Sequence, residues 1–107
     1  MRVYVAGPYA IGDVLANVRA AVLAGDRLLS AGHTPYVPHL NHYWDAIVER
    51  PTADWLAFDT EWLAVCDALI RLPGESVGSD NEVVRAHLWG IKVWDGPDPV
   101  AAFLGER

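Results

Sequence analysis

The chain has 107 residues, of which 52% are hydrophobic and 21% are charged, and its formal net charge is −6. This length fits one compact domain over residues 1–107, and so small a domain leaves enough surface uncovered that we expect a homodimer or a higher homo-oligomer. Eight Lys and Arg against 14 Asp and Glu form no basic stripe, so the composition argues against binding of polymeric nucleic acid.

The cysteine content and the apolar runs indicate the cellular location. Cys66 is the one cysteine in the sequence, which excludes a disulfide framework and fits a reducing cytosol. The first residues lack the regions of a signal peptide, and Arg19 interrupts the longest apolar candidate, 14–29, short of the roughly 20 residues that span a bilayer. We therefore expect a cytoplasmic protein with no membrane partner.

The first half of the chain predicts two strands and a helix. Residues 3–6 are a β-branched and aromatic run that stops at Gly-Pro, the pattern of a buried parallel strand. Apolar residues at helical spacing then predict a helix up to residue 31, with Asp13 as its N-cap. A second strand is expected at 34–37, whereas 39–50 has no clear periodicity and its structure is not predicted.

The second half continues the alternation of helices and strands. A helix is expected to open at Pro51, and 67–72 is a third strand ended by Pro-Gly. The next helix begins near Ser79, which forms a capping box, S-x-x-E, with Glu82. A fourth strand at 91–94 precedes a short C-terminal helix.

This alternation predicts an α/β fold with a parallel sheet of four to five strands. We expect a flavodoxin-like three-layer sandwich with the strand order 2-1-3-4. In that order the loops after the first and third strands face each other where ligands bind. These loops, 7–12 and 74–80, contain glycine and lead into helix N-termini, which attract anions. A ligand with a negative group is one interpretation, and ordinary turn glycines are the other.

A combination of residues near these loops is more specific. It comprises Tyr4 in the first strand, the turn AGPY at 6–9, Asp59, Asp67, Ser76, Gly78, Ser79 and Glu82. Over residues 1–94 it resembles the nucleoside 2-deoxyribosyltransferase-like family, which has a flavodoxin-like fold and includes base-exchanging transferases and nucleoside 5′-monophosphate N-glycosidases. The resemblance implies cleavage or transfer at the N-glycosidic bond of (deoxy)nucleosides or their 5′-monophosphates.

The resemblance also implies roles for individual side chains. Glu82 matches the nucleophile that attacks the anomeric carbon and forms a covalent glycosyl-enzyme, as in retaining glycosidases. Asp59 matches the carboxylate that faces the base, Tyr4 the tyrosine that orients the nucleophile, and Asp67 a residue to which we assign a structural role. The alternative explanations are a capping box for Glu82, a buried core aromatic for Tyr4 and a solvated helix residue for Asp59.

The predicted binding residues lie around this set and are Gly7, Pro8, Tyr9, Ser76, Gly78, Ser79, His39, His42 and Trp44. Ser76 stands where the family's monophosphate hydrolases tend to carry a phosphate-binding serine and its transferases an Asp, which favours nucleotides. The loop 7–12, however, lacks the basic residue of those hydrolases, with Arg19 as a possible substitute. Trp44 offers a flat face for a nucleobase, and a core or dimer contact is the alternative.

His39, His42 and Asp45 have the spacing of metal ligands, but the set is incomplete, so we expect no metal and no cofactor. The sequence thus predicts an enzyme, an N-glycosidase (nucleotide N-hydrolase) or nucleoside deoxyribosyltransferase, whose partner is a small-molecule nucleoside or nucleotide. A non-catalytic nucleotide-binding module and an NAD-type nucleosidase are the alternatives. The base, the sugar, the presence of a phosphate and the acceptor remain open.

Overall fold

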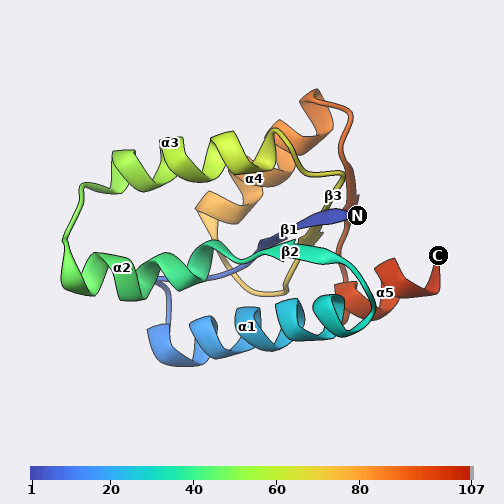
Figure 1. Ribbon diagram of the computed structural model, residues 1–107, viewed down its shortest axis with the longest axis horizontal. Coiled ribbons are helices and arrows are strands. Elements are labelled where there is room, and N and C mark those ends of the chain that lie inside the picture. Colours follow the sequence, from blue (N-terminus) through green and yellow to red (C-terminus); the bar gives the residue numbers. More distant parts are fainter. Residues whose placement is uncertain (107) are drawn as a thin grey trace.

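A computed structural model describes residues 1–106 and shows a three-layer α/β sandwich (Figure 1). Within these residues four parallel strands form one sheet in the order β2-β1-β3-β4. The strands are β1 (Arg2–Ala6), β2 (Thr34–Tyr36), β3 (Ala68–Arg71) and β4 (Lys92–Trp94). The predicted fold class and strand order are therefore confirmed.

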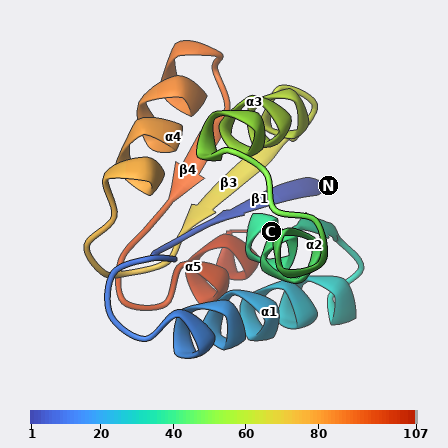
Figure 2. The same ribbon diagram turned by 90° about the vertical axis from the view of Figure 1, so that its left-hand side faces the viewer.

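The helices cover both faces of this sheet. They are α1 (Val14–Ser30), α2 (Asn41–Ile47), α3 (Thr52–Leu63), α4 (Val77–Leu88) and α5 (Pro99–Gly105). Figure 2 shows α1 and α5 on one face and α3 and α4 on the other. Within the described residues no helix combines the length and the apolarity that crossing a bilayer requires.

Alternation along β1 divides the core into two clusters. Val3 and Val5 pack with residues of α1 and α5, whereas Tyr4 and Ala6 pack with residues of α3 and α4. Successive side chains of a strand point to opposite faces, so this division follows from the strand itself. It places the Tyr4 ring, which is completely buried, on the face that α4 covers.

Helix caps fix where α1 and α4 begin. The side chain of Asp13 accepts hydrogen bonds from the backbone N–H groups of Leu15 and Ala16, so the predicted N-cap of α1 is confirmed. The prediction for α4 is wrong by three residues, because Ser76 and not Ser79 is its N-cap. Ser76 has an extended backbone, and its Oγ accepts from the N–H of Ser79 at 3.1 Å. Glu82 therefore lies in the second turn of α4, outside any capping box.

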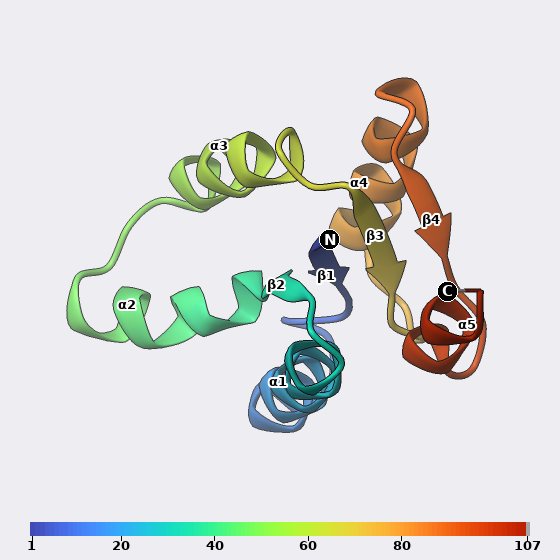
Figure 3. The same cartoon turned by 45° about the vertical axis from the view of Figure 1, so that its right-hand side comes forward.

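The segment without a predicted structure forms an arm beside the sheet. A 3₁₀ turn, Pro38–Leu40, runs into α2, and α3 returns antiparallel to it, so that both helices extend beyond the sheet (Figure 1, Figure 3). We call residues 38–63 the α2–α3 arm. Trp44 packs edge-on against Trp55 and Phe58, with ring centroids 5.3 and 5.8 Å apart, and joins the two helices.

Two aspartate side chains bind backbone N–H groups, one at the tip of the arm and one at the start of the sheet. At the tip of the arm Asp45 Oδ1 accepts from the backbone N–H of Arg50 and from Trp55 Nε1, both at 2.9 Å. At the start of the sheet Asp67 Oδ2 accepts from the backbone N–H of Arg2 at 2.8 Å, which links β1 to the residue before β3. This contact gives Asp67 a structural role.

Candidate active site

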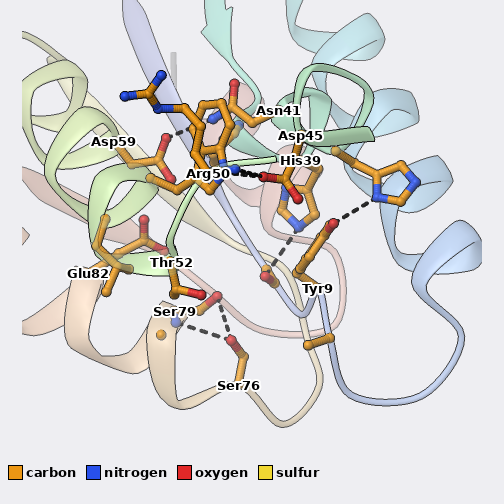
Figure 4. A pocket seen from close by; sticks show the side chains of 17 residues that line it. Tyr9, His39, Asn41, Asp45, Arg50, Thr52, Asp59, Ser76, Ser79 and Glu82 are labelled. Atoms are coloured by element: carbon orange, nitrogen blue, oxygen red, sulfur yellow. Dashed lines mark hydrogen bonds between the residues drawn. The ribbon is translucent and has the colours of Figure 1, made fainter. Parts of the chain in front are cut away.

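A cavity of about 350 Å³ lies between the carboxyl ends of β1 and β3 and the α2–α3 arm (Figure 4). Its lining comes from the loop after β1, from the arm and from the first two turns of α4. The position is the one expected for a ligand in a sheet of this order, and the volume is within the usual range for small-molecule sites.

A buried hydrogen bond holds one carboxyl group in this cavity. Glu82 lines it from α4, and the hydroxyl of Tyr4 donates to Glu82 Oε2 from below. Burial raises the pKa of Glu82 to about 7; the Tyr4 bond opposes the rise and the nearby Asp59 adds to it. Tyr4 itself has a pKa far above its ordinary value, because it is buried and faces Glu82, and so it stays a donor. Glu82 is therefore oriented and changes charge near neutral pH.

A second carboxyl group, Asp59, is held by side chains of β2 and the arm. Asp59 Oδ1 accepts from the Tyr36 hydroxyl at 2.8 Å and from Asn41 Nδ2 at 3.1 Å. No described residue bonds to Oδ2. Burial raises the pKa of Asp59 to about 6, against the lowering effect of both hydrogen bonds. Asp59 and Glu82 lie on the same side of the cavity in Figure 4, opposite Tyr9 and His39.

Two histidines connect the arm to the loop after β1. His39 Nε2 donates to the carbonyl oxygens of Gly7 and Pro8, at 3.2 and 3.0 Å, which assigns the proton to Nε2. Its Nδ1 is buried and has no hydrogen-bond partner among the described residues. Burial lowers the pKa of His39, so the ring is neutral. His42 Nδ1 lies 2.7 Å from the hydroxyl of Tyr9.

The serines of the α4 entrance are engaged with each other. The hydroxyl of Ser76 lies 3.0 Å from Ser79 Oγ, and Ser76 Oγ also accepts from the Ser79 backbone N–H. Ser79 is 2% exposed. Both serines and Gly78 line the cavity, but the Ser76 hydroxyl stabilises the helix terminus.

The structure brings most of the predicted site residues together. Glu82, Asp59, Gly7, Tyr9, His39, His42, Ser76, Gly78 and Ser79 line the cavity, and Tyr4 lies beneath it. Pro8 is not part of the lining, although its carbonyl binds His39. Trp44 does not line this cavity, and its ring packs on Trp55 and Phe58, the core contact that was its alternative role. Arg19 is exposed on α1 and does not line the cavity either.

The arm contributes lining residues that the sequence did not indicate. They include Asn41, Asp45, Arg50, Thr52 and Trp55. The sequence indicates Asp45 only as a metal ligand, and the lack of periodicity in 39–50 gives no signal for the others within that stretch. Within residues 1–106 no three His, Cys, Asp or Glu side chains gather as a metal site would require.

Comparisons with known proteins agree with this architecture. The model of a domain of unknown function, DUF7768, matches residues 1–95. No curated protein matches the sequence. Among solved structures, the 2-deoxyribosyltransferase of the psychrotolerant bacterium Bacillus psychrosaccharolyticus is similar, with a TM-score of 0.70 and 22% identity over 89% of this chain and 71% of that one. This likeness confirms the predicted nucleoside 2-deoxyribosyltransferase-like fold.

Proposed function

The chain belongs to the DUF7768 family, and we propose that it is an enzyme that breaks the N-glycosidic bond of a nucleoside-type substrate, with transfer of the glycosyl group to water or to another base. The observation that carries this proposal is the Glu82 carboxyl group, oriented by the buried Tyr4 hydroxyl, on one cavity wall with Asp59. The name of the similar solved structure, a 2-deoxyribosyltransferase, supports the same reaction class.

The proposed reaction uses the two carboxyl groups in different roles. In the first step ionised Glu82 attacks the anomeric carbon, so that a C–O bond to Glu82 forms while the C–N bond to the base breaks. Asp59, whose pKa burial raises to about 6, gives its proton to the leaving base nitrogen. Because the pKa of Glu82 is about 7, the reactive form with Glu82 ionised and Asp59 protonated is the minor one of the two singly protonated forms. In the second step water or another base attacks the same carbon, releases Glu82 and returns a proton to Asp59.

The helix cap supports the catalytic role of Glu82 over the structural one. A non-catalytic binding module would be favoured if Glu82 folded back to cap α4. Ser76 caps the helix instead, and Glu82 faces the cavity. A carboxyl group with neither a capping role nor an ion pair, whose burial raises its pKa to about 7, is costly for the fold, and such groups are concentrated at functional sites. Association into a homodimer and a cytoplasmic location stay predictions.

The test is product identification with a matched pair of variants. We expect the protein to release free base from one or more members of a panel of ribo- and 2′-deoxynucleosides and their 5′-monophosphates, incubated with and without a second base. Glu82→Gln should lower this activity about a thousandfold or more, since an amide cannot form the glycosyl ester. Glu61→Gln, an exposed carboxylate on α3 outside the cavity, is the control and should change little.

Two results would contradict the proposal. If the folded Glu82→Gln variant kept a tenth or more of the activity, Glu82 would not be the nucleophile. If the unmodified protein released no base from any member of the panel but bound one of them in calorimetry, the binding-module alternative would replace the proposed enzyme.

A further inference from the structure

The charges around the cavity bear on which form of substrate the proposed enzyme takes. Three carboxyl groups line the cavity, those of Asp45, Asp59 and Glu82, and among the lining residues Arg50 alone carries a full positive charge. The backbone N–H of Arg50 and the indole of Trp55 hold the pKa of Asp45 below its ordinary value, so Asp45 is ionised and offsets Arg50 by itself. Each ionisation of Asp59 or Glu82 then makes the cavity negative, and a phosphate dianion would enter against that charge.

The one arginine of the lining is also partly engaged outside the cavity. Arg50 Nη2 lies 3.2 Å from Asp54 Oδ2, one turn along the arm. The other arginine near the α4 entrance, Arg71, does not line the cavity. Its guanidinium, which is 12% exposed, binds Asp80 Oδ1 at 2.9 Å and the carbonyl of Ser76. Arg71 is held by these contacts, and the single positive charge of Arg50 is offset by the carboxylates of Asp45 and Asp54 beside it.

Several of the neutral donors predicted to bind substrate are occupied as well. The Ser76 hydroxyl is bonded to Ser79 Oγ, and the N–H of Ser79 is bonded to Ser76 Oγ. The one ring N–H of His39 donates to the carbonyl oxygens of Gly7 and Pro8. In the first turn of α4 Asp80 is paired with Arg71, so this pair adds no uncompensated positive charge at the helix terminus.

The cavity lining is instead rich in hydrogen-bond acceptors, the carboxyl oxygens of Asp45, Asp59 and Glu82. Ionised carboxylates only accept hydrogen bonds, and a phosphate at neutral pH likewise offers little but acceptors. The hydroxyl groups of a sugar donate hydrogen bonds, so an uncharged nucleoside complements this lining where its phosphorylated form does not. The net charge of −6 acts over longer distances in the same direction.

We infer that the site takes an uncharged nucleoside and discriminates against the corresponding 5′-monophosphate. The inference rests on the proposed function and narrows it. It also reverses the preference for nucleotides that Ser76 suggested, because the hydroxyl expected to bind phosphate caps α4.

The experiment compares kcat/KM for one nucleoside and its 5′-monophosphate in the unmodified protein and in two variants of Ala10. Ala10 is an exposed lining residue in the loop after β1, where no basic residue stands. The unmodified protein should prefer the nucleoside about tenfold or more, a difference of about 1.4 kcal/mol. Ala10→Lys should reduce this preference severalfold, and salt at about 0.5 M should weaken that reduction, as screening requires. Ala10→Gln, similar in length but uncharged, should keep the preference.

A third variant tests the serine directly. Ser76→Ala should leave the ratio of the two kcat/KM values unchanged, because both substrates meet the same helix terminus. A selective loss for the monophosphate would overturn the inference, as would equal or better use of the monophosphate by the unmodified protein.

Failure of the inference and failure of the proposed function give different results. A protein that cleaves the monophosphate better refutes the inference and leaves the N-glycosidic reaction intact. If neither substrate is cleaved, the proposed function fails, and calorimetric titration of the same two compounds decides the inference. Tighter binding of the nucleoside supports it, whereas tighter or equal binding of the monophosphate, or binding of neither, overturns it.

Discussion

The two sides of the cavity are held in place by different means. On the sheet side Tyr4 belongs to a strand that is buried from Val3 to Ala6, and Glu82 contacts it from a helix packed over the same core. On the other side α3 joins the core at its end through Leu63, whereas the α2 end of the arm reaches the loop after β1 through separate polar contacts, His39 with Gly7 and Pro8, and His42 with Tyr9. The nucleophile of the proposed enzyme is thus fixed by packing, and much of the binding surface by hydrogen bonds.

Because of this difference, mutations on the two sides should have different effects on catalysis. A hydrogen bond contributes only about 1 kcal/mol to stability, and segments held by a few of them open more easily than a packed core. Changes beneath Glu82 should therefore act on the chemical step, and changes in the arm on substrate binding. Asp59 is the exception, since it is carried by α3 but tied to β2 through Tyr36.

The largest effect is expected for Tyr4→Phe. Removing the hydroxyl takes away the hydrogen bond that lowers the pKa of Glu82, so this pKa rises above about 7 and less of the nucleophile is ionised. The loss in kcat should be about 100-fold near pH 6, about tenfold of it from a rise of about one unit in this pKa and the rest from the lost orientation of Glu82. Near pH 8.5, where Glu82 is mostly ionised in both proteins, the loss should be about tenfold. A pH–rate profile measures it. Tyr43→Phe, on the exposed face of the arm, is the control, and an equal loss at every pH would show that Tyr4 does not act on the charge of Glu82.

A smaller effect is expected for Glu82→Gln on stability. Here the substitution should raise the free energy of unfolding. The folded-state pKa of Glu82 is raised, so its contribution to stability is complete below the ordinary pKa near 4.5 and is lost as the pH rises through about 7. Glu82→Gln removes this loss and should make the protein about 2 kcal/mol more stable than the unmodified chain near pH 8.5, with no such gain near pH 4. Denaturant unfolding at both pH values measures it, with Glu61→Gln as the control. An unchanged or lower stability at the higher pH would contradict the assigned burial.

The smallest effect is expected at the tip of the arm. Asp45→Ala removes the acceptor of Arg50 N–H and Trp55 Nε1 and should cost about 1 kcal/mol. We expect KM to rise severalfold while kcat changes little, and hydrogen exchange to increase within 38–63 but not in β1 or β3. The control is Asp54→Ala, which breaks only the exposed ion pair with Arg50. A lower kcat with an unchanged KM would show that the arm and the sheet side do not act separately.

The sequence predicted those parts of the fold that depend on local pattern. The buried run at 3–6, the spaced apolar residues of α1 and the Asp13 cap each specify an element through their own neighbours, and the structure contains all three. The order 2-1-3-4, expected from the flavodoxin-like fold, is also present. The two serines at the start of α4 show the limit of such patterns. Ser76 and Ser79 both fit an N-cap, and the loop that enters the helix decides between them.

The site could be predicted only in part, for the same reason. Tyr4, Asp59 and Glu82 were found through a motif spread over the chain, and they lie at or beneath one cavity. Asn41 and Arg50 could not be found, because each meets the cavity only once α2 and α3 have folded back on each other. The stretch around them is stabilised by aromatic contacts such as that of Trp44 with Phe58, which have no period in the sequence.

The contact between Pro8 and Gly74 limits where the cavity can be enlarged for a bulkier substrate. Gly74 has φ +119°, and a β-carbon added there would stand 2.7 Å from Pro8 Cγ, so the loops after β1 and β3 are pressed together without room for a side chain. Their separation beside the cavity is therefore fixed, although neither residue lines it. A variant selected for a bulkier base cannot gain space at this edge, because widening it would separate β1 from β3. Directed evolution of this scaffold should therefore collect its productive substitutions in the arm, at positions such as Thr52 and Leu56, and leave the glycine and the proline untouched.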